Sequence, residues 1–229
     1  MRQKIIPRGG LLLGWNLAIV VMTAIGCVVM LFFGSEDGIL VAHGAENLKF
    51  FTVLSNLFEG LVSLILALRL WRIRRGRAAG IPHGLFLLKL IACVTVTVTF
   101  LVVALFFGPL YGYLILYEGA NLWFHLVIPL LAILEFIFLD RFDELSFRET
   151  LLPVLAPLIY GLLYCLNLLA NGVGTGPDTN DFYGFLLWGL PVGLCIFAGI
   201  LLLVWAAGVL LRLGNRAGRK RNTERTGGK

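Results

Sequence analysis

Charged residues are scarce in this chain. Lys, Arg, Asp and Glu together make up 14% of its 229 residues, whereas an ordinary soluble domain carries about 25%. Hydrophobic residues account for 59%. A core of this size cannot hide so much apolar surface, because a chain of this length still leaves much of its surface facing the solvent. The composition therefore excludes a soluble enzyme and a disordered tail, and it predicts that most of the chain is surrounded by lipid.

Cysteine and the motifs of common enzymes are scarce as well. All four cysteines fall within apolar runs, where a thiol behaves as a small apolar side chain. They are Cys27, Cys93, Cys165 and Cys195. The chain contains no zinc-ligand spacing, phosphate-binding glycine loop, dinucleotide fingerprint or G-x-S-x-G motif. We therefore expect no disulfide framework, no metal site and no organic cofactor.

Long apolar runs are what the chain does contain. A helix needs about 20 mainly apolar residues to cross the hydrocarbon core of a bilayer, and six segments meet this requirement. They cover residues 11–33, 49–71, 84–107, 121–139, 150–170 and 184–211. The runs are continuously apolar rather than alternating, which favours helices over the strands of a barrel. The sequence thus predicts an all-α polytopic membrane protein, with one six-helix domain over residues 1–212 and a flexible basic tail over 213–229.

The basic residues are concentrated on one side of this topology. The net charge is +6, and nearly all basic residues precede the first run or follow the second, fourth and sixth runs. The other connections hold a single basic residue, Lys49, beside acidic residues such as Glu46 and Asp178. By the positive-inside rule, both termini are expected in the cytoplasm. Topology and contact with anionic lipid explain these charges, so no nucleic-acid partner is expected.

Polar residues in the second apolar run fall on one side of its helix. Such residues are expensive in lipid and are functional candidates by default. Thr52, Asn56 and Glu59 are spaced i, i+4 and i+7 and so share a helix face, with Ser55 beside them. Each also has a structural explanation. A membrane threonine often bonds a carbonyl of its own helix, and Glu59 is within reach of Lys89 as an ion-pair partner.

The fourth and fifth runs add polar residues at a similar depth. Asn121 and His125 are four residues apart, and His125 is the only one of three histidines inside a run. Both Thr52 and His125 are expected about 5 Å below the outer boundary, at 1.5 Å per residue. The fifth run crosses in the opposite direction and brings Tyr164 and Asn167 to the same level. The spacing thus predicts a polar site near the non-cytoplasmic side of the membrane.

The segments FFTVLSN (50–56) and NLWFHLVIPLLAILEFIFLD (121–140) resemble a known family. It is the family of androgen-induced and androgen-dependent six-helix membrane proteins, and the chain looks closer to the bacterial branch. The characterised animal members hydrolyse fatty acid esters of hydroxy fatty acids with an intramembrane threonine nucleophile and a histidine. The resemblance implies an integral protein of a bacterial cytoplasmic membrane, with Thr52 and His125 at the positions of the catalytic pair.

The leading hypothesis is therefore an intramembrane hydrolase whose substrate is a lipid or other acyl ester. Thr52 attacks the ester to form an acyl-threonine, and His125 is the general base. Asn56 or Asn121 supplies a donor to the oxyanion, or Asn121 instead orients the imidazole. The remaining candidates for the wall of the pocket are Ser55, Glu59, Tyr164 and Asn167. The alternatives are a transporter of a small molecule or lipid, and a lipid-binding or accessory protein without chemistry. The sequence does not predict the oligomeric state.

Overall fold

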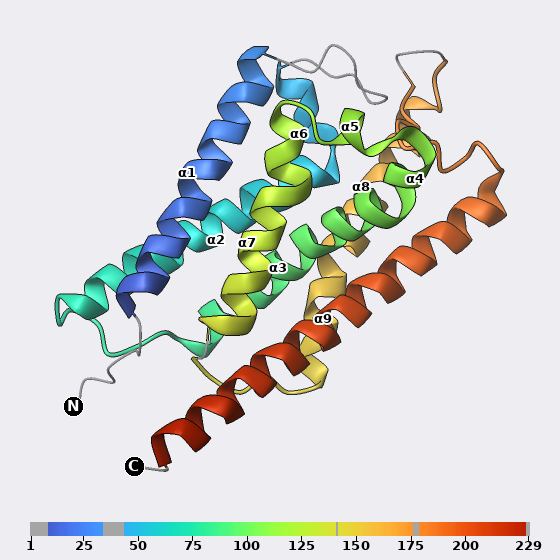
Figure 1. Cartoon of the computed structure of the whole chain (residues 1–229). Coiled ribbons are helices and arrows are strands. Elements are labelled where there is room, and N and C mark those ends of the chain that lie inside the picture. Colours follow the sequence, from blue (N-terminus) through green and yellow to red (C-terminus); the bar gives the residue numbers. More distant parts are fainter. Residues whose placement is uncertain (1–8, 34–43, 141, 176–178, 228–229) are drawn as a thin grey trace.

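The computed structural model describes residues 9–33, 44–140, 142–175 and 179–227, and all regular structure within these ranges is helical (Figure 1). Six helices in the described ranges are long and apolar enough to cross a membrane. They cover Gly9–Phe32, Phe51–Arg74, His83–Tyr111, Ala120–Phe138, Arg148–Asn171 and Leu190–Arg219. The structure confirms the predicted fold class, an all-α protein with six candidate membrane helices.

Some of the membrane helices are continuous and others are composite. The continuous ones are α1 (Gly9–Phe33), α2 (Phe51–Arg74) and α9 (Leu190–Gly227). The third crossing joins α3 (His83–Val102), the π-helical turn η2 (Val103–Phe107) and α4 (Gly108–Tyr111). The fourth joins α6 (Ala120–Leu122), the π-helical turn η3 (Trp123–Val127) and α7 (Ile128–Phe138). The fifth joins the 3-10 turn η4 (Arg148–Val154) and α8 (Leu155–Asn171). Short helices η1 (Gly44–Lys49) and α5 (Tyr113–Leu116) lie in connections.

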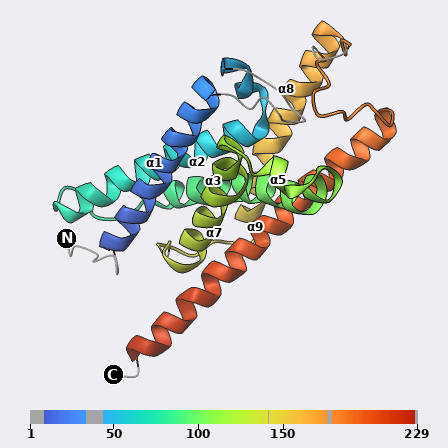
Figure 2. The same cartoon turned by 45° about the horizontal axis from the view of Figure 1, so that its top comes forward.

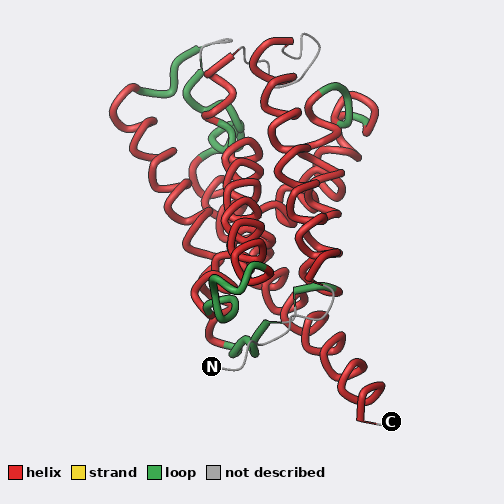
Figure 3. The backbone as a smooth tube through the Cα atoms, turned by 90° about the vertical axis from the view of Figure 1, so that its left-hand side faces the viewer, coloured by secondary structure: helices red, strands yellow, loops and turns green. Residues whose placement is uncertain are grey.

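The helix α3 lies at the centre of the bundle. It packs against α2, α7 and α9, and α1 packs on the other side of α2. The start of α1 and the last turns of α9 lie at the same end of the bundle (Figure 1), as six crossings require. A tilted view shows α9 running along the edge of the bundle (Figure 2), and its last turns project beyond the other helices (Figure 3). We call the opposite end of the bundle, where α2 begins, the far end.

The bundle differs from a soluble protein in its apolar outer surface and in the charged side chains of its interior. Large apolar side chains cover its outer surface, and Leu61 and Leu68 of α2 are more than half exposed. The interior contains apolar clusters and, among them, fully buried polar and charged side chains such as Asn16, Glu59 and Lys89. Outward-facing leucines are unfavourable in water but not in lipid, whose tails are equally apolar. This distribution supports a membrane environment independently of helix length.

The sixth membrane helix differs from the prediction at both ends. Residues 184–189, expected as its first turns, form turns outside the helix. Gly184 and Gly189 have φ values of +68° and +83°, a left-handed conformation that glycine adopts readily and that interrupts a right-handed helix. At the other end the helix continues to Gly227. The predicted tail over 213–229 is therefore helical for most of its length, and its last two residues lie outside the described ranges.

The helices α1 and α2 approach closely at Gly60. A Cβ atom at this position would lie 2.7 Å from Cγ2 of Thr23, a short branched side chain with little freedom to move away. We therefore expect Gly60→Val to lower the stability of the bundle by about 1–3 kcal/mol, measured as a lower midpoint of thermal unfolding in detergent. Gly14→Ala is the control, because a Cβ there meets nothing within 4 Å. Equal midpoints for both variants would contradict the close approach.

Candidate active site

The polar residues of α2 lie on the face that packs inside the bundle, as their helical spacing predicts. Ser55, Asn56 and Glu59 are buried, and buried Ser63 continues the set one turn further along the helix. Thr52, in the first turn of α2, is half-buried. The helix therefore carries polar groups from the far end of the bundle into its middle.

The side chain of Asn56 connects the helix that carries Thr52 to the helix that carries His125. Its Nδ2 donates to the carbonyl oxygen of Thr52 (2.8 Å) and to that of Phe124 (3.0 Å), the residue before His125. An asparagine amide has two N–H donors, so both are engaged. Because one nitrogen binds both carbonyls, the backbones at Thr52 and Phe124 lie side by side at one level of the bundle.

His125 lies within the π-helical turn η3. Such turns inside α-helices are rare and frequently occur at functional sites. The imidazole Nδ1 lies 2.7 Å from the carbonyl oxygen of Leu116, in the connection before this helix. A carbonyl oxygen accepts and cannot donate, so Nδ1 carries the proton in the neutral ring and Nε2 presents a lone pair. This bond gives His125 the tautomer and the fixed orientation that a general base requires.

The side chains of Thr52 and His125 are close in depth but are not joined by a hydrogen bond within the described residues. The Thr52 hydroxyl has no hydrogen-bond partner in this part of the chain, so it does not bond its own helix. The half-buried side-chain amide of Asn121 likewise has no partner among the described residues. Since both donors of Asn56 are engaged, Asn121 is the candidate with an available donor for an oxyanion.

The side chain of Ser55 links α2 to α3, and its hydrogen bonds do not involve His125. Its Oγ donates to the carbonyl oxygen of Thr52 (3.0 Å) and lies 3.1 Å from Oγ1 of Thr99. This contact fixes the rotation of the first turns of α2 against α3. Ser55 therefore contributes to the position of Thr52 through the backbone.

The two candidates on α8 hold the connection that precedes α9. The hydroxyl of Tyr164 donates to Oδ1 of Asp181 (2.6 Å), and Nδ2 of Asn167 donates to Oδ1 of Asn180 (3.3 Å). The carboxylate of Asp181 also accepts two backbone N–H groups later in the same connection. Sequence reasoning missed this organising role of Asp181, because its partner on α8 is distant in sequence.

The same connection reaches the start of α2. The hydroxyl oxygen of Tyr183 accepts the backbone N–H of Phe51 (2.8 Å), next to Thr52, and the Tyr160 hydroxyl donates to the carbonyl oxygen of Lys49 (2.5 Å). Burial raises the pKa of the Tyr183 phenol, which therefore stays neutral. The aromatic side chains of Tyr160 and Tyr183 thus lie against the start of α2.

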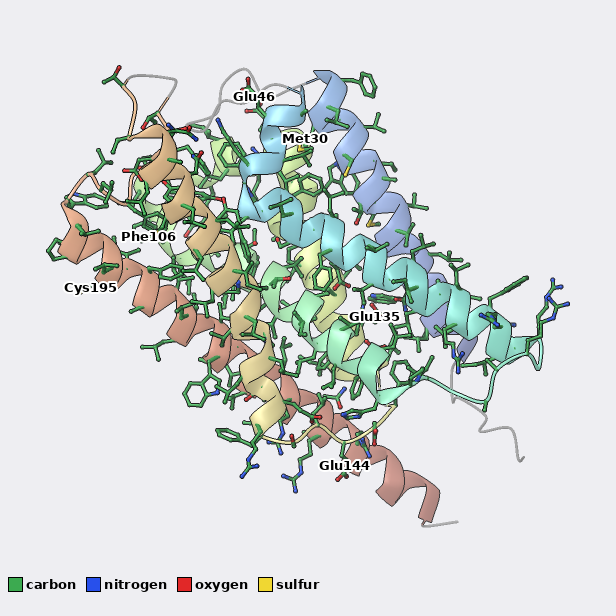
Figure 4. All side chains as sticks on the ribbon, turned by 180° about the vertical axis from the view of Figure 1, so that it is seen from behind. Met30, Glu46, Phe106, Glu135, Glu144 and Cys195 are labelled. Carbon is green, nitrogen blue, oxygen red and sulfur yellow. The ribbon has the colours of Figure 1, made fainter. Side chains whose placement is uncertain are left out.

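A cluster of buried charged residues lies deeper along α2. The Nζ atom of Lys89 lies 2.5 Å from Oε1 of Glu59, 2.9 Å from Oγ of Ser63 and 2.8 Å from Oε2 of Glu135. Asn16 of α1 donates to Oε1 of Glu135, which is labelled in the interior in Figure 4. The predicted pairing of Glu59 with Lys89 is confirmed, so Glu59 faces Lys89 and not Thr52. We call these five residues the ionic cluster.

Comparison with protein-family models, curated proteins and solved structures finds no match to this chain. In the ranges that the structure describes, no group of three or more His, Cys, Asp or Glu side chains is arranged to hold a metal ion. Function must therefore be inferred from the geometry around Thr52 and His125.

Proposed function

We propose that this protein is an intramembrane hydrolase of lipid esters, with Thr52 as the nucleophile and His125 as the general base. The observation that carries the proposal is the bridge from the Asn56 amide to the carbonyls of Thr52 and Phe124. This bridge holds the two candidate catalytic residues on neighbouring turns. The bond from Nδ1 of His125 to Leu116 supports it further, because Nε2 is left as a proton acceptor.

The proposed reaction has two steps. Thr52 Oγ1 attacks the ester carbonyl carbon while its proton passes to Nε2 of His125. The side-chain amide of Asn121 is the available donor to the negative oxygen of the tetrahedral intermediate. The ester C–O bond then breaks, the alcohol leaves with the proton from the imidazolium, and an acyl-threonine remains. Water attacks this acyl group with the same imidazole as base, which releases the fatty acid and restores the hydroxyl.

The position of the site favours a substrate with a long acyl chain. Thr52 lies in the first turn of α2, near the far end of the bundle, where water is close to the membrane boundary. The neighbouring outer surface is apolar, and Leu54 is 40% exposed. An acyl chain therefore approaches sideways through lipid, while the water for the second step arrives from the membrane surface. The distribution of basic residues supports a non-cytoplasmic position for this end of the bundle.

Covalent labelling tests the nucleophile. Purified protein is incubated with a fluorophosphonate probe, which reacts with activated hydroxyl nucleophiles, and the labelled peptide is identified by mass spectrometry. We expect label on Thr52 in the wild type and none in Thr52→Ala. Thr97→Ala is the matched control, because Thr97 is buried and bonds the carbonyl of Cys93 (2.7 Å) in its own helix. Label that persists in Thr52→Ala excludes Thr52 as the nucleophile.

Transport of a small molecule or lipid is the second candidate function, and the ionic cluster is the observation that favours it. Glu59, Lys89 and Glu135 are fully buried between helices, and ionisable residues at such positions mark substrate or ion pathways in many membrane proteins. Reconstitution in liposomes separates the two functions. Flux of a fluorescent lipid across the bilayer without ester cleavage favours transport, and cleavage that depends on Thr52 favours hydrolysis.

A further inference from the structure

A buried carboxyl group without a partner adjoins the ionic cluster. Asp140 follows the end of α7, and its side chain is fully buried. Within the described part of the chain, neither oxygen of its carboxyl group has a hydrogen-bond partner. The backbone N–H of Asp140 donates to the carbonyl oxygen of Glu135 (3.0 Å), and the amide of Asn215 from α9 donates to the backbone carbonyl of Asp140.

The three close contacts of the Lys89 ammonium group do not include Asp140. A lysine carries three N–H donors, and the three nearby acceptors are Glu59, Ser63 and Glu135. Ser63 also donates to Glu59 (3.1 Å). These contacts describe one charged ammonium group that is paired with the two glutamates and bonded to Ser63.

The charges in this region do not balance if every acid is ionised. Among the residues that the structure describes, one lysine faces the carboxyl groups of Glu59, Glu135 and Asp140, so three ionised acids would leave two excess negative charges in this buried group. An uncompensated buried charge is expensive, and the usual response is uptake of a proton. Burial raises the pKa of the Asp140 carboxyl and Glu135 and Glu59 raise it further, against the opposing effect of Lys89.

We propose that Asp140 and the ionic cluster form a buried proton-binding site. Asp140 holds the proton at neutral pH, and Glu59 and Glu135 share the positive charge of Lys89. Donors from Ser63 and Asn16 stabilise the one negative charge that remains. The site is separate from the proposed active site, because Glu59 follows Thr52 by seven positions along α2, about 10 Å at 1.5 Å per residue.

Infrared spectroscopy detects this proton directly. The full-length protein is labelled with 13C at its aspartate carboxyl groups and purified in a detergent without ester groups. At neutral pH we expect the carbonyl stretch of a protonated aspartic acid, which shifts in D2O and is lost in Asp140→Asn. Asp143→Asn is the matched control and should keep the band. The backbone N–H of Glu144 and then His83 lower the pKa of the exposed Asp143 carboxyl, which is therefore ionised and contributes no such band.

Absence of the band in the wild type at neutral pH overturns the proposal, and it is the result expected if a metal cation sits beside an ionised Asp140. A band that remains in Asp140→Asn overturns the assignment to this residue.

Stability gives a second readout. A carboxyl whose pKa is raised by folding stabilises the protein at low pH, and this contribution is lost as the pH rises through the raised value. The unfolding midpoint of the wild type should therefore fall toward alkaline pH more steeply than that of Asp140→Asn, and parallel curves contradict the proton.

Discussion

Replacing His125 with alanine is expected to lower kcat/KM for a long-chain acyl ester by about 10²–10⁴-fold, the usual contribution of a general base. Alanine removes the Nε2 acceptor, and a threonine hydroxyl is a poor nucleophile unless a base takes its proton. The bundle should remain folded, because the lost hydrogen bond is a single contact to the carbonyl of Leu116. Hydrolysis of a p-nitrophenyl ester of a long-chain fatty acid by purified protein measures the effect.

A second histidine provides the control for this experiment. His83 lies at the opposite end of the bundle, between Oδ2 of Asp143 and Oε1 of Glu149 at 2.7 Å each. His83→Ala removes an imidazole that the proposed reaction does not use, so hydrolysis should be unchanged. If His125→Ala keeps the wild-type rate while Thr52→Ala loses it, another group is the base and the proposed pairing is wrong.

The sequence was sufficient to predict the crossings and the buried face of α2, for a physical reason. In lipid, the backbone N–H and C=O groups of a spanning segment must be paired. A continuously apolar run of sufficient length is therefore expected to form a membrane-spanning helix. Within α2, the spacing of Thr52, Asn56 and Glu59 determines that they share a face, and polar residues in a membrane bundle turn inward. The pairing of Glu59 with Lys89 follows, because a buried carboxylate needs a cation.

The contacts between helices were less predictable. Whether two polar residues meet depends on how each helix is rotated about its own axis, and a single sequence does not determine this rotation. The π-helical turn η3 changes the direction of the side chains where His125 lies, and no sequence motif predicts this turn. Asn16 and Asp140 were missed for the same reason, although an isolated amide inside an apolar run and an acid at the end of one were visible signals. The late start of α9 depends on the left-handed conformation of Gly189. The sequence does not predict this conformation, because Gly189 lies inside a continuous apolar run.

Replacing Lys89 with methionine is expected to destabilise the folded bundle by about 3–5 kcal/mol, the usual effect of removing one partner from a buried ion pair. Methionine has a similar length and no polar donor, so the substitution mainly removes the ammonium group from between Glu59 and Glu135. Both glutamate side chains are fully buried and would be left without their cation. Thermal unfolding of the wild type and the variant in one detergent measures the loss. The loss should shrink at acidic pH, because protonated carboxyl groups no longer need a cation.

Two further variants identify the cause of this loss. Lys49→Met makes the same substitution at a half-buried lysine whose ammonium group lies over two aromatic rings, and the loss expected there is about 1 kcal/mol or less. Combining Lys89→Met with Glu59→Gln and Glu135→Gln removes all three charges and should restore much of the stability, because a neutral interior often replaces a buried ion pair without loss. A loss in Lys89→Met no larger than that in Lys49→Met contradicts a charged cluster. In that case the two glutamates are already neutral, and the lysine is held by hydrogen bonds alone.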